Sequence, residues 1–415
     1  MSSAQGQSTM RLKFAATIND EALPENVDPD FEIAYIDIGS VDSSGTIHEI
    51  VDYRFEAAPS RARRIVRDGD VIISTVRTYL QAIAPIISPP ENLIVSTGFA
   101  VVRPRPDQLD PGFCRYAVRE PRFLAEVEMR STGISYPAIN ASEIGDITIA
   151  LPELPVQRRT SAFLDAELSQ LNTLIEAKQN LLSLLAEKRR RLVVDAVMSG
   201  LDCSAPSRPS GIDWLGDIPA HWEVRRLATL FTEKDERNEP DLPLLEVSIN
   251  TGVSVRQFST KQIEGTAADF NTYKVARNGS IAFNKMRMWQ GAVGVTPTDG
   301  LISPDYVVAE PSLEIDSRFA GLLFRTAAFS AECARNSQGI TWDRLRLYWD
   351  GFRDISIGLP PLDEQRQIAE RIGIEASKID KLATATERSI GLLKERRGAL
   401  IAAAVTGELE IPEAA

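Results

Sequence analysis

The sequence has few of the residues that most often carry catalysis or bind metals. Its two histidines, His48 and His221, have neither a cysteine nor a second histidine at the spacing of a metal site. Its three cysteines, Cys114, Cys203 and Cys333, lie far apart, which argues against a disulfide framework or a zinc cluster. We therefore expect no metal and no cofactor.

Familiar catalytic motifs are missing as well. There is no G-x-x-x-x-G-K-[ST] phosphate loop, and no G-x-G-x-x-G opens a helix after a strand. The Asn-Pro-Pro-Tyr motif of DNA amino-methyltransferases is absent, since residues 88–91 read Ser-Pro-Pro-Glu. A nuclease-like Glu-x-Lys at 176–178 falls within a long helical run, where residues two apart do not share a face. The sequence thus offers no catalytic constellation.

Targeting and membrane segments are not expected either. Residues 1–10 are polar, which argues against a signal peptide. No uncharged apolar run approaches the length that crosses a bilayer. We expect a cytoplasmic protein without a membrane partner.

The charge balance is acidic, with 46 basic and 58 acidic residues and a net charge of −12. The arginines are nevertheless clustered, and a local basic face can bind phosphate on an acidic protein. Solvated surface arginines remain an equally good interpretation of each cluster. The clusters are Arg61, Arg63, Arg64 and Arg67, then Arg103 and Arg105, and finally Arg335, Arg344, Arg346 and Arg353.

One long stretch occurs twice, at residues 149–201 and 357–409. Each copy passes Leu-Pro and Gln-Arg, continues without proline, and ends on a basic cluster. Apolar residues spaced by fours and threes predict a coiled-coil seam in each copy. The first seam is Leu164, Leu168, Leu171, Ile175, Leu182, Leu185, Leu192 and Ala196, and the second is Ile372, Ala376, Ile379, Ala383, Ile390, Leu393, Leu400 and Ala404.

Roughly forty helical residues would form a rod of about 60 Å, which favours a spacer over a helix of one core. Two ordinary amphipathic helices of one core are the alternative. The second rod is expected to be the weaker helix, because Gly373 and Gly391 each cost about 1 kcal/mol relative to alanine.

Two bodies alternate with the rods. Short strands are predicted around 34–38, 71–73, 99–102 and 147–149, and a helix over 111–129 is predicted to break near Pro121. Residues 222–356 repeat this plan: 279–284 match 69–74, Arg287 matches Arg77, and 337–342 match 131–136.

Residues 202–211 are interpreted as a linker, and Trp214 and Trp222 as packing anchors. Because each rod ends where the other begins, paired rods must be antiparallel, so we predict a pseudo-twofold, mixed α/β (α+β) protein.

These motifs resemble those of the specificity subunits of type I restriction–modification enzymes. The residues that carry the resemblance are Tyr35-Ile36-Asp37-Ile38-Gly39, residues 69–74, the entry at 214–224, and Leu359-Pro360-Pro361-Leu362-Asp363-Glu364-Gln365-Arg366. The Leu-Pro-x-Leu-x-x-Gln-Arg entry before a coiled-coil arm, found twice, is the specific part.

The resemblance implies target-recognition domains at 1–150 and 206–356, with spacer helices at 151–205 and 357–415. Each domain would read one half of a bipartite site in double-stranded DNA. Two modification subunits would bind S-adenosylmethionine and methylate adenine, and restriction subunits would supply ATP-driven translocation and cleavage. The chain itself would be non-catalytic. Candidate docking residues at the helix entries are Gln157, Arg158, Gln365 and Arg366.

Candidate DNA-binding residues follow matching strands in the two bodies. Arginine can bind guanine bidentately, asparagine adenine, and lysine phosphate. Glycine lets a backbone approach phosphate closely. The candidates are Arg61, Arg63, Arg64, Thr75, Arg77, Tyr79, Thr132 and Gly133 in the first body, and Asn284, Lys285, Arg287, Trp289, Gln338 and Gly339 in the second. Arg77 and Arg287 could instead contact phosphate or form a salt bridge of the fold.

Two other functions stay open on the sequence alone. One is a self-sufficient DNA endonuclease or methyltransferase with a degenerate site, against which the missing motifs count. The other is a coiled-coil scaffold with no role on DNA.

Overall fold

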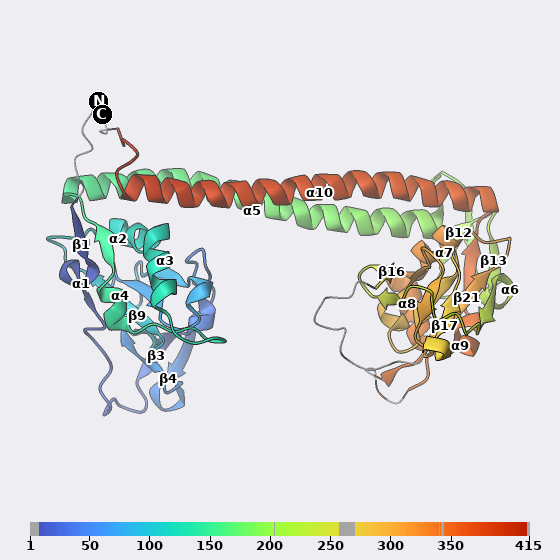
Figure 1. The fold of residues 1–415 in the computed structure, drawn as a ribbon, viewed down its shortest axis with the longest axis horizontal. Helices are drawn as coiled ribbons and strands as arrows, with labels where there is room; N and C mark the ends of the chain where they lie inside the picture. The colour runs from blue at the N-terminus through green and yellow to red at the C-terminus, as the bar shows by residue number, and fades with distance from the viewer. Residues whose placement is uncertain (1–7, 203, 257–269, 340, 342–343, 413–415) are drawn as a thin grey trace. The chain divides into compact units, whose positions relative to one another are not determined.

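The computed structural model describes residues 8–202, 204–256, 270–339, 341 and 344–412, so Cys203, Ile340 and Trp342 lie outside the described residues. The chain divides into two compact units (Figure 1). Unit 1 comprises residues 1–179 and 387–415, and unit 2 comprises residues 180–386. Each unit therefore combines one body with one part of each long helix.

Two four-stranded sheets form the centre of unit 1. The first has the antiparallel order β2-β9-β6-β7, with bounds Ala16–Ile18, Phe99–Pro104, Val71–Ser74 and Ile83–Pro85. The second has the order β4-β3-β8-β5, with a parallel β3–β8 pair and bounds Val51–Arg54, Glu32–Ile36, Leu93–Ser96 and Ala62–Ile65. A separate pair joins β1 (Thr9–Arg11) to β10 (Thr148–Ala150).

The first sheet separates two cores because its side chains alternate between faces. On β6, Val71 and Ile73 enter the core shared with the helices, whereas Ile72 enters the core shared with the second sheet. Four short helices complete the unit: α1 (Leu12–Ala15), α2 (Pro111–Ala117), α3 (Pro121–Arg130) and α4 (Ala141–Gly145). The predicted break at Pro121 is confirmed, since α2 ends before it and α3 starts on it.

Unit 2 repeats this plan. Its main sheet has the order β14-β21-β18-β19, with bounds Phe231–Lys234, Tyr306–Pro311, Ile281–Asn284 and Val293–Val295. The pairs are β13 (Glu223–Arg226) with β22 (Ser356–Leu359), β15 (Leu245–Ser248) with β16 (Gly252–Val255), and β17 (Lys274–Ala276) with β20 (Gly300–Ile302). The helices are α6 (Leu227–Leu230), α7 (Ser317–Phe324), α8 (Ala327–Arg335) and α9 (Trp349–Asp354).

Two tryptophans anchor unit 2 as predicted. Trp222 is buried in the main core, and Trp214 packs edge-on against Phe329. The interpretation of residues 202–211 as a plain linker is wrong in part. Residues 207–209 form β11 (Ser207–Pro209), which pairs with β12 (Asp217–Pro219), and Arg208 Nη2 donates to the Trp222 carbonyl at 2.7 Å. This hairpin ties the end of the first long helix to unit 2.

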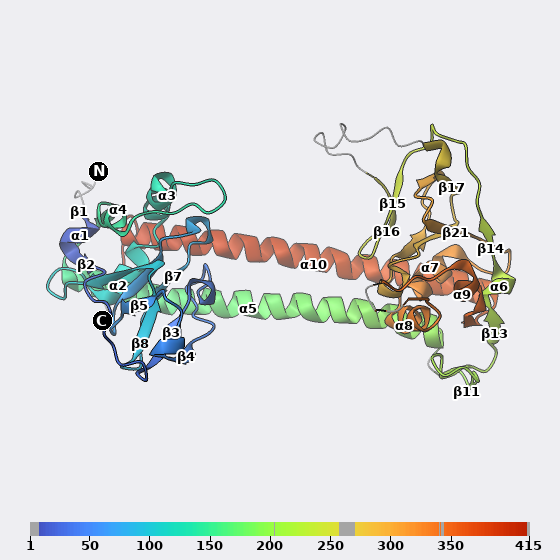
Figure 2. The same ribbon diagram turned by 90° about the horizontal axis from the view of Figure 1, so that it is seen from below.

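The two repeats of the sequence form the long helices α5 (Leu154–Ser199) and α10 (Leu362–Val405) (Figure 2). Within unit 1, Leu164, Leu168 and Leu171 share a core with Ile401, Ala404 and Val405. Within unit 2, Ala196 and Val197 share a core with Ile368 and Ile372. The start of each helix thus packs with the end of the other, which confirms an antiparallel pair.

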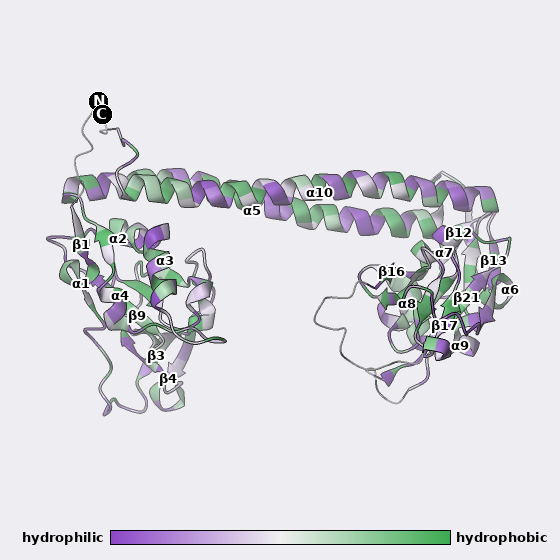
Figure 3. Cartoon of the chain, in the orientation of Figure 1, coloured by the Kyte–Doolittle hydropathy of each residue, from purple (hydrophilic) through white to green (hydrophobic). Residues whose placement is uncertain are grey.

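Polar contacts between the helices repeat the same symmetry. In unit 2, Arg189 Nε donates to Asp380 Oδ1 at 3.1 Å. At the equivalent place in unit 1, Arg397 Nη1 donates to Asn172 Oδ1 at 3.4 Å. Apolar residues recur among polar ones along both long helices (Figure 3), and the seam of a coiled coil needs such a recurrence every three or four residues.

Candidate nucleic-acid interface

The segment after β6 presents Arg77 to solvent. Ser74 Oγ donates to the Val76 carbonyl at 2.7 Å, and Thr75 Oγ1 donates to the Gly98 carbonyl at 2.8 Å. Arg77 then adopts a left-handed conformation (φ 51°), which is uncommon for a residue with a side chain. Its guanidinium carbon lies 5.0 Å from the centre of the Tyr136 ring, and no ion pair holds it among the described residues.

The loop 131–139 packs beside this segment. Ile139 N donates to the Thr75 carbonyl at 2.9 Å, and Thr132 and Ala138 exchange two backbone hydrogen bonds of 2.9 Å. Thr78 Oγ1 lies 2.8 Å from Ser131 Oγ. The structure therefore brings two sequence candidates together, the patch of Thr75, Arg77 and Tyr79 and the patch of Thr132 and Gly133.

The equivalent segment of unit 2 is built alike but carries different side chains. Leu347 N donates to the Lys285 carbonyl at 2.8 Å, and Gln338 and Arg346 exchange backbone hydrogen bonds of 2.9 Å. Arg287 is exposed, has no ion pair among the described residues, and adopts an ordinary negative φ of −131°. Lys285, Arg287, Gln338 and the exposed Arg346 thus lie on neighbouring segments.

Three candidate DNA-binding residues of unit 2 make contacts within the unit that give them a role in its fold. Asn284 Oδ1 accepts from Met286 N at 2.9 Å, which gives this side chain a role in the turn after β18. Trp289 is half-buried, and its Nε1 donates to the Met286 carbonyl at 3.0 Å. A Cβ on Gly339 would lie 2.7 Å from the Arg344 carbonyl oxygen, so close backbone packing accounts for this glycine.

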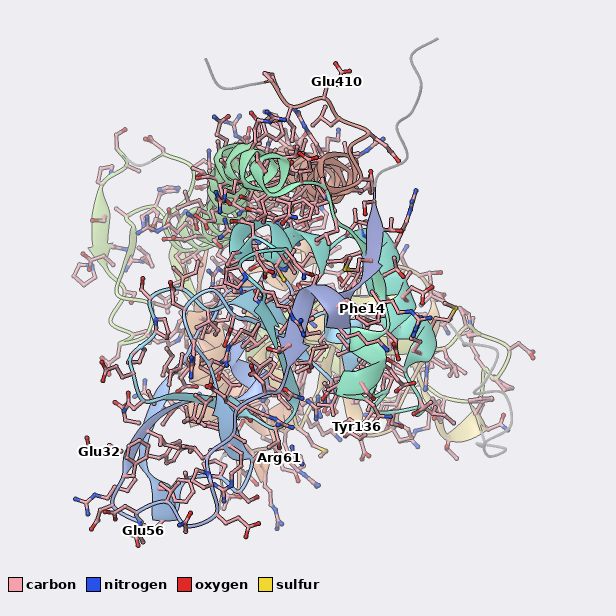
Figure 4. All side chains as sticks on the ribbon, turned by 90° about the vertical axis from the view of Figure 1, so that its left-hand side faces the viewer. Phe14, Glu32, Glu56, Arg61, Tyr136 and Glu410 are labelled. Atoms are coloured by element: carbon pink, nitrogen blue, oxygen red, sulfur yellow. The ribbon has the colours of Figure 1, made fainter. Side chains whose placement is uncertain are left out.

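The arginines of β5 differ in exposure. Arg61 is exposed, and Figure 4 shows it with Tyr136 on the half of unit 1 that lies away from the long helices. Arg63 is half-buried, with its guanidinium carbon 4.7 Å from the Phe55 ring centre. Arg64 is also half-buried, and its Nε has no hydrogen-bond partner within the described part of the chain.

Other clustered arginines serve the fold. Arg103 donates to both carboxylate oxygens of Asp70 at 2.9 and 2.8 Å and pairs with Asp20 at 2.9 Å. The hydrogen bonds that Arg103 donates to Asp70 raise the pKa of Arg103 further above its usual range. Arg67 pairs with Glu21. These two arginines are neutralised internally, so Arg61 and Arg77 are the stronger candidates for phosphate or bases.

Gln157 and Gln365 fasten the long helices to the bodies. Gln157 Oε1 accepts from Asp110 N at 2.8 Å, and its Nε2 donates to the carbonyls of Gln108 and Pro152 at 2.9 and 2.7 Å. In unit 2, the Gln365 side chain makes the equivalent three bonds with Asp316 N and the carbonyls of Glu314 and Pro360.

Both glutamines have no exposed surface, so neither can contact a docked subunit. The prediction that Gln157 and Gln365 dock partner subunits is therefore wrong, and both side chains instead hold a long helix to its body. Arg158 and Arg366 follow them on the exposed side of the helices, with side chains 68% and 56% exposed, and remain candidates.

Each unit also has a groove between a long helix and the short helices of its body, which sequence reasoning missed. The unit 2 groove holds about 970 Å³ between α5, α7, α8 and the turn at 288–290, and the unit 1 groove about 350 Å³ between α10, α3 and the turn before β7. The unit 2 groove is lined by Arg189, Arg190, Val193, Trp289, Arg325 and Arg335, and the unit 1 groove by Arg119, Leu124, Glu128, Lys394, Arg397 and Ile401.

A half-buried arginine lines each groove. Arg119 Nη2 donates to the Ile83 carbonyl at 2.6 Å, and burial together with nearby Arg397 lowers the pKa of Arg119 to about 10. Arg325 donates to the Ile249 and Asn250 carbonyls at 3.0 and 2.7 Å, and burial together with Arg189 lowers its pKa. The only signal of these arginines in the sequence is their matching position just before α3 and α8.

Comparisons with known proteins agree with this architecture. Residues 219–387 match the family described as "Type I restriction modification DNA specificity domain". The solved HsdS subunit from Thermoanaerobacter tengcongensis is 22% identical, with 99% of both chains covered and a TM-score of 0.54. A chain described under "Structural basis underlying complex assembly and conformational transition of the type I R-M system" is 22% identical, with coverage of 99% of this chain and 100% of that one and a TM-score of 0.71. A search of curated proteins gave no match.

The solved structures show that the whole chain has the fold of HsdS subunits. Residues 219–387 match the model of the type I restriction-modification DNA specificity domain, and the resemblance inferred from the sequence is confirmed by this match and by the shared fold. In the described part of the chain, no helix has both the length and the apolar composition needed to cross a bilayer. The same residues contain no cluster of three or more metal-binding side chains.

Proposed function

We propose that this chain is the DNA-specificity subunit of a type I restriction–modification complex and reads a bipartite, asymmetric site. Two units of the same plan carry an exposed arginine, Arg77 or Arg287, at the equivalent place after the equivalent strand. Neither arginine has a carboxylate partner among the described residues. This duplicated arginine carries the proposal, because free guanidinium groups can bind guanine or phosphate.

The residues that precede the two arginines explain why the half-sites would differ. Thr75 lies two residues before Arg77 in unit 1, whereas Lys285 holds the same place before Arg287 in unit 2. Different side chains on one scaffold would select different bases. We place the recognition domains at 1–150 and 206–356 and the spacer helices at 151–205 and 357–415.

Partner subunits would supply the chemistry. Each unit has one groove and one exposed arginine at a helix entry, Arg158 or Arg366. Two copies of one modification subunit could therefore dock on similar surfaces of the two units. The unit 2 groove has four arginines and no carboxylate in its lining, which suits an acidic, partly apolar segment. We infer that restriction subunits join this assembly, that it acts on chromosomal DNA in the cytoplasm, and that the chain itself transfers no methyl group.

Methylome sequencing tests the proposal. Cells that express the chain with its modification subunit should carry methyladenine in one bipartite motif, and cells without the chain should not. Methyl transfer to DNA by the homogeneous chain alone would contradict it. Methylation of unrelated single sites in both cultures would show that the chain does not select the target.

A further inference from the structure

A basic residue occupies the same place in the two units. Arg64 on β5 pairs with Val95 of β8, and Lys274 on β17 pairs with Ile302 of β20. The third residue after each is an arginine whose Nε donates to a glutamate, at 3.0 Å in unit 1 and 3.2 Å in unit 2. The shared register and the shared neighbour show that Arg64 and Lys274 are equivalent.

Both side chains lie on a strand face that belongs to a small core between sheets. Directly opposite residues of an antiparallel pair share a face, and Val95 and Ile302 are members of these cores. Lys274 is only 4% exposed. Arg64 is half-buried, and its guanidinium makes no ion pair or hydrogen bond with the described residues. Because a buried charge without a counter-ion is costly, both units carry this cost at the same point.

Lys274 is not neutralised by the described residues of its unit. Their nearest carboxylate oxygen, Glu233 Oε1, lies 4.0 Å from Lys274 Nζ, which is too far for a hydrogen bond. Burial lowers the pKa of Lys274, and the nearby Lys285 adds to this shift, whereas Asp235 opposes it. Asp235, however, already accepts two hydrogen bonds from Arg237, at 2.7 and 3.0 Å. An anion from outside the unit would supply the missing charge.

The surroundings of these cations favour a DNA phosphate over the carboxylate of a partner protein. Lys274 lies near Lys285, which stands two residues before the exposed Arg287. In unit 1, the turn 97–98 makes backbone hydrogen bonds of 2.8 Å to the residue before β5 and to the residue after β6. Each cation is thus next to the segment that carries a proposed base contact. Phosphates flank every base, and contacts to them set the register in which bases are read.

We propose that Lys274 and Arg64 are positioning residues that each bind a backbone phosphate of the half-site read by their unit. The phosphate supplies the counter-ion that each buried cation lacks, and it holds the unit on the duplex while Arg287 or Arg77 contacts the bases. This inference rests on the proposed function, and it adds the contact that positions each unit.

The salt dependence of binding tests the contact in the full chain with its modification subunits. Each phosphate contact contributes about 0.9 to the slope of log affinity against log salt. Lys274→Met should lose the same factor of affinity on the target and on a random duplex. Its affinity should fall about 3.5-fold less than that of the parent protein between about 50 and about 200 mM salt. Lys274→Arg should keep the parent slope, since unit 1 carries arginine at this place.

Stability separates a phosphate contact from a role in the fold. Removal of a buried charge that lacks a partner should not destabilise unit 2, which contains all five tryptophans. The tryptophan transition of Lys274→Met should therefore occur at the same or a higher denaturant concentration. If this variant does not fold, Arg64→Met gives the same salt test in unit 1. Lys234→Met is the matched control, because Lys234 is exposed and pairs with Glu310 at 2.8 Å, and it should keep the parent slope.

An unchanged salt slope in Lys274→Met, or an earlier tryptophan transition with unchanged DNA affinity, would overturn the proposal. Loss on the target alone would show that Lys274 reads a base, and weakened subunit assembly with unchanged DNA affinity would show that it meets a partner's carboxylate. Either result overturns the proposal as well. If the parent complex selects no sequence, the proposed function fails; if it selects a sequence and Lys274→Met keeps the parent slope, this inference alone fails.

Discussion

Gln157 and Gln365 show what a sequence reveals about single residues and what it hides. The Gln-Arg pairs are visible as a repeat, and the same repeat predicts that both glutamines share one role. The Gln-Arg pair does not show that the glutamine side chain is buried. Its burial depends on hydrogen bonds to carbonyls 5 to 51 residues away along the chain. The same limit applies to Arg103, whose partner Asp70 lies 33 residues away.

At this scale we expect Gln365→Ala to destabilise unit 2 selectively. The change leaves the N–H of Asp316 and two carbonyls buried without partners, at a cost of about 1–3 kcal/mol for such a group. All five tryptophans lie between residues 214 and 349, so their fluorescence reports on unit 2. Denaturant titration should show an earlier tryptophan transition.

Gln157→Ala supplies the matched control, since it removes the same contacts from unit 1. The tryptophan transition should stay at the same denaturant concentration as in the parent protein. The helical signal in circular dichroism should begin to fall at a lower denaturant concentration. An unchanged tryptophan transition in Gln365→Ala would show that this amide does not hold unit 2 together.

The long helices were the most predictable elements. Period and register depend on local spacing, and the predicted seam residues Leu164, Leu168, Ile372 and Ala404 are buried as expected. The pairing direction also followed from the chain order. The grooves were not predictable, because they arise where a helix meets the short helices of a body, and no local pattern marks that meeting.

At the scale of elements we expect Gly373→Ala and Gly391→Ala each to stabilise α10 by about 1 kcal/mol, the difference in helix propensity. Both glycines lie inside the helix, and a Cβ at either position meets nothing within 4 Å. Amide hydrogen exchange along α10 measures the gain.

Gly45→Ala is a control that should change stability in the opposite direction. Gly45 has a φ of 86°, and a Cβ there would collide with the Arg119 guanidinium. It should destabilise unit 1. Faster exchange in α10 of the Gly373 or Gly391 variants would contradict the expectation that these glycines only weaken the helix.

For the whole molecule, the proposed bipartite site links helix length to DNA spacing. One added heptad in each helix, between Ala177 and Lys178 and between Ala385 and Thr386, keeps the seam in register. It adds about 10 Å at 1.5 Å per residue. At about 34 Å per ten base pairs, the unread spacer should lengthen by about three base pairs with unchanged half-sites.

The same heptad in α5 alone is the control, because it leaves seam residues of one helix without partners in the other. It should lower stability and abolish site-specific methylation. A double-insertion variant that methylates the original motif at full rate would show that the helices do not set the spacing.

The central claim is that each unit reads its own half-site, and competition binding of Arg77→Ala and Arg287→Ala tests it most directly. Each variant complex is titrated against the intact target and against targets with one half-site scrambled. Arg77→Ala should become indifferent to one half-site and Arg287→Ala to the other, with a loss of about 1–3 kcal/mol on the intact target for a bidentate base contact. Equal loss on both halves, or the same loss on random DNA, would contradict the claim.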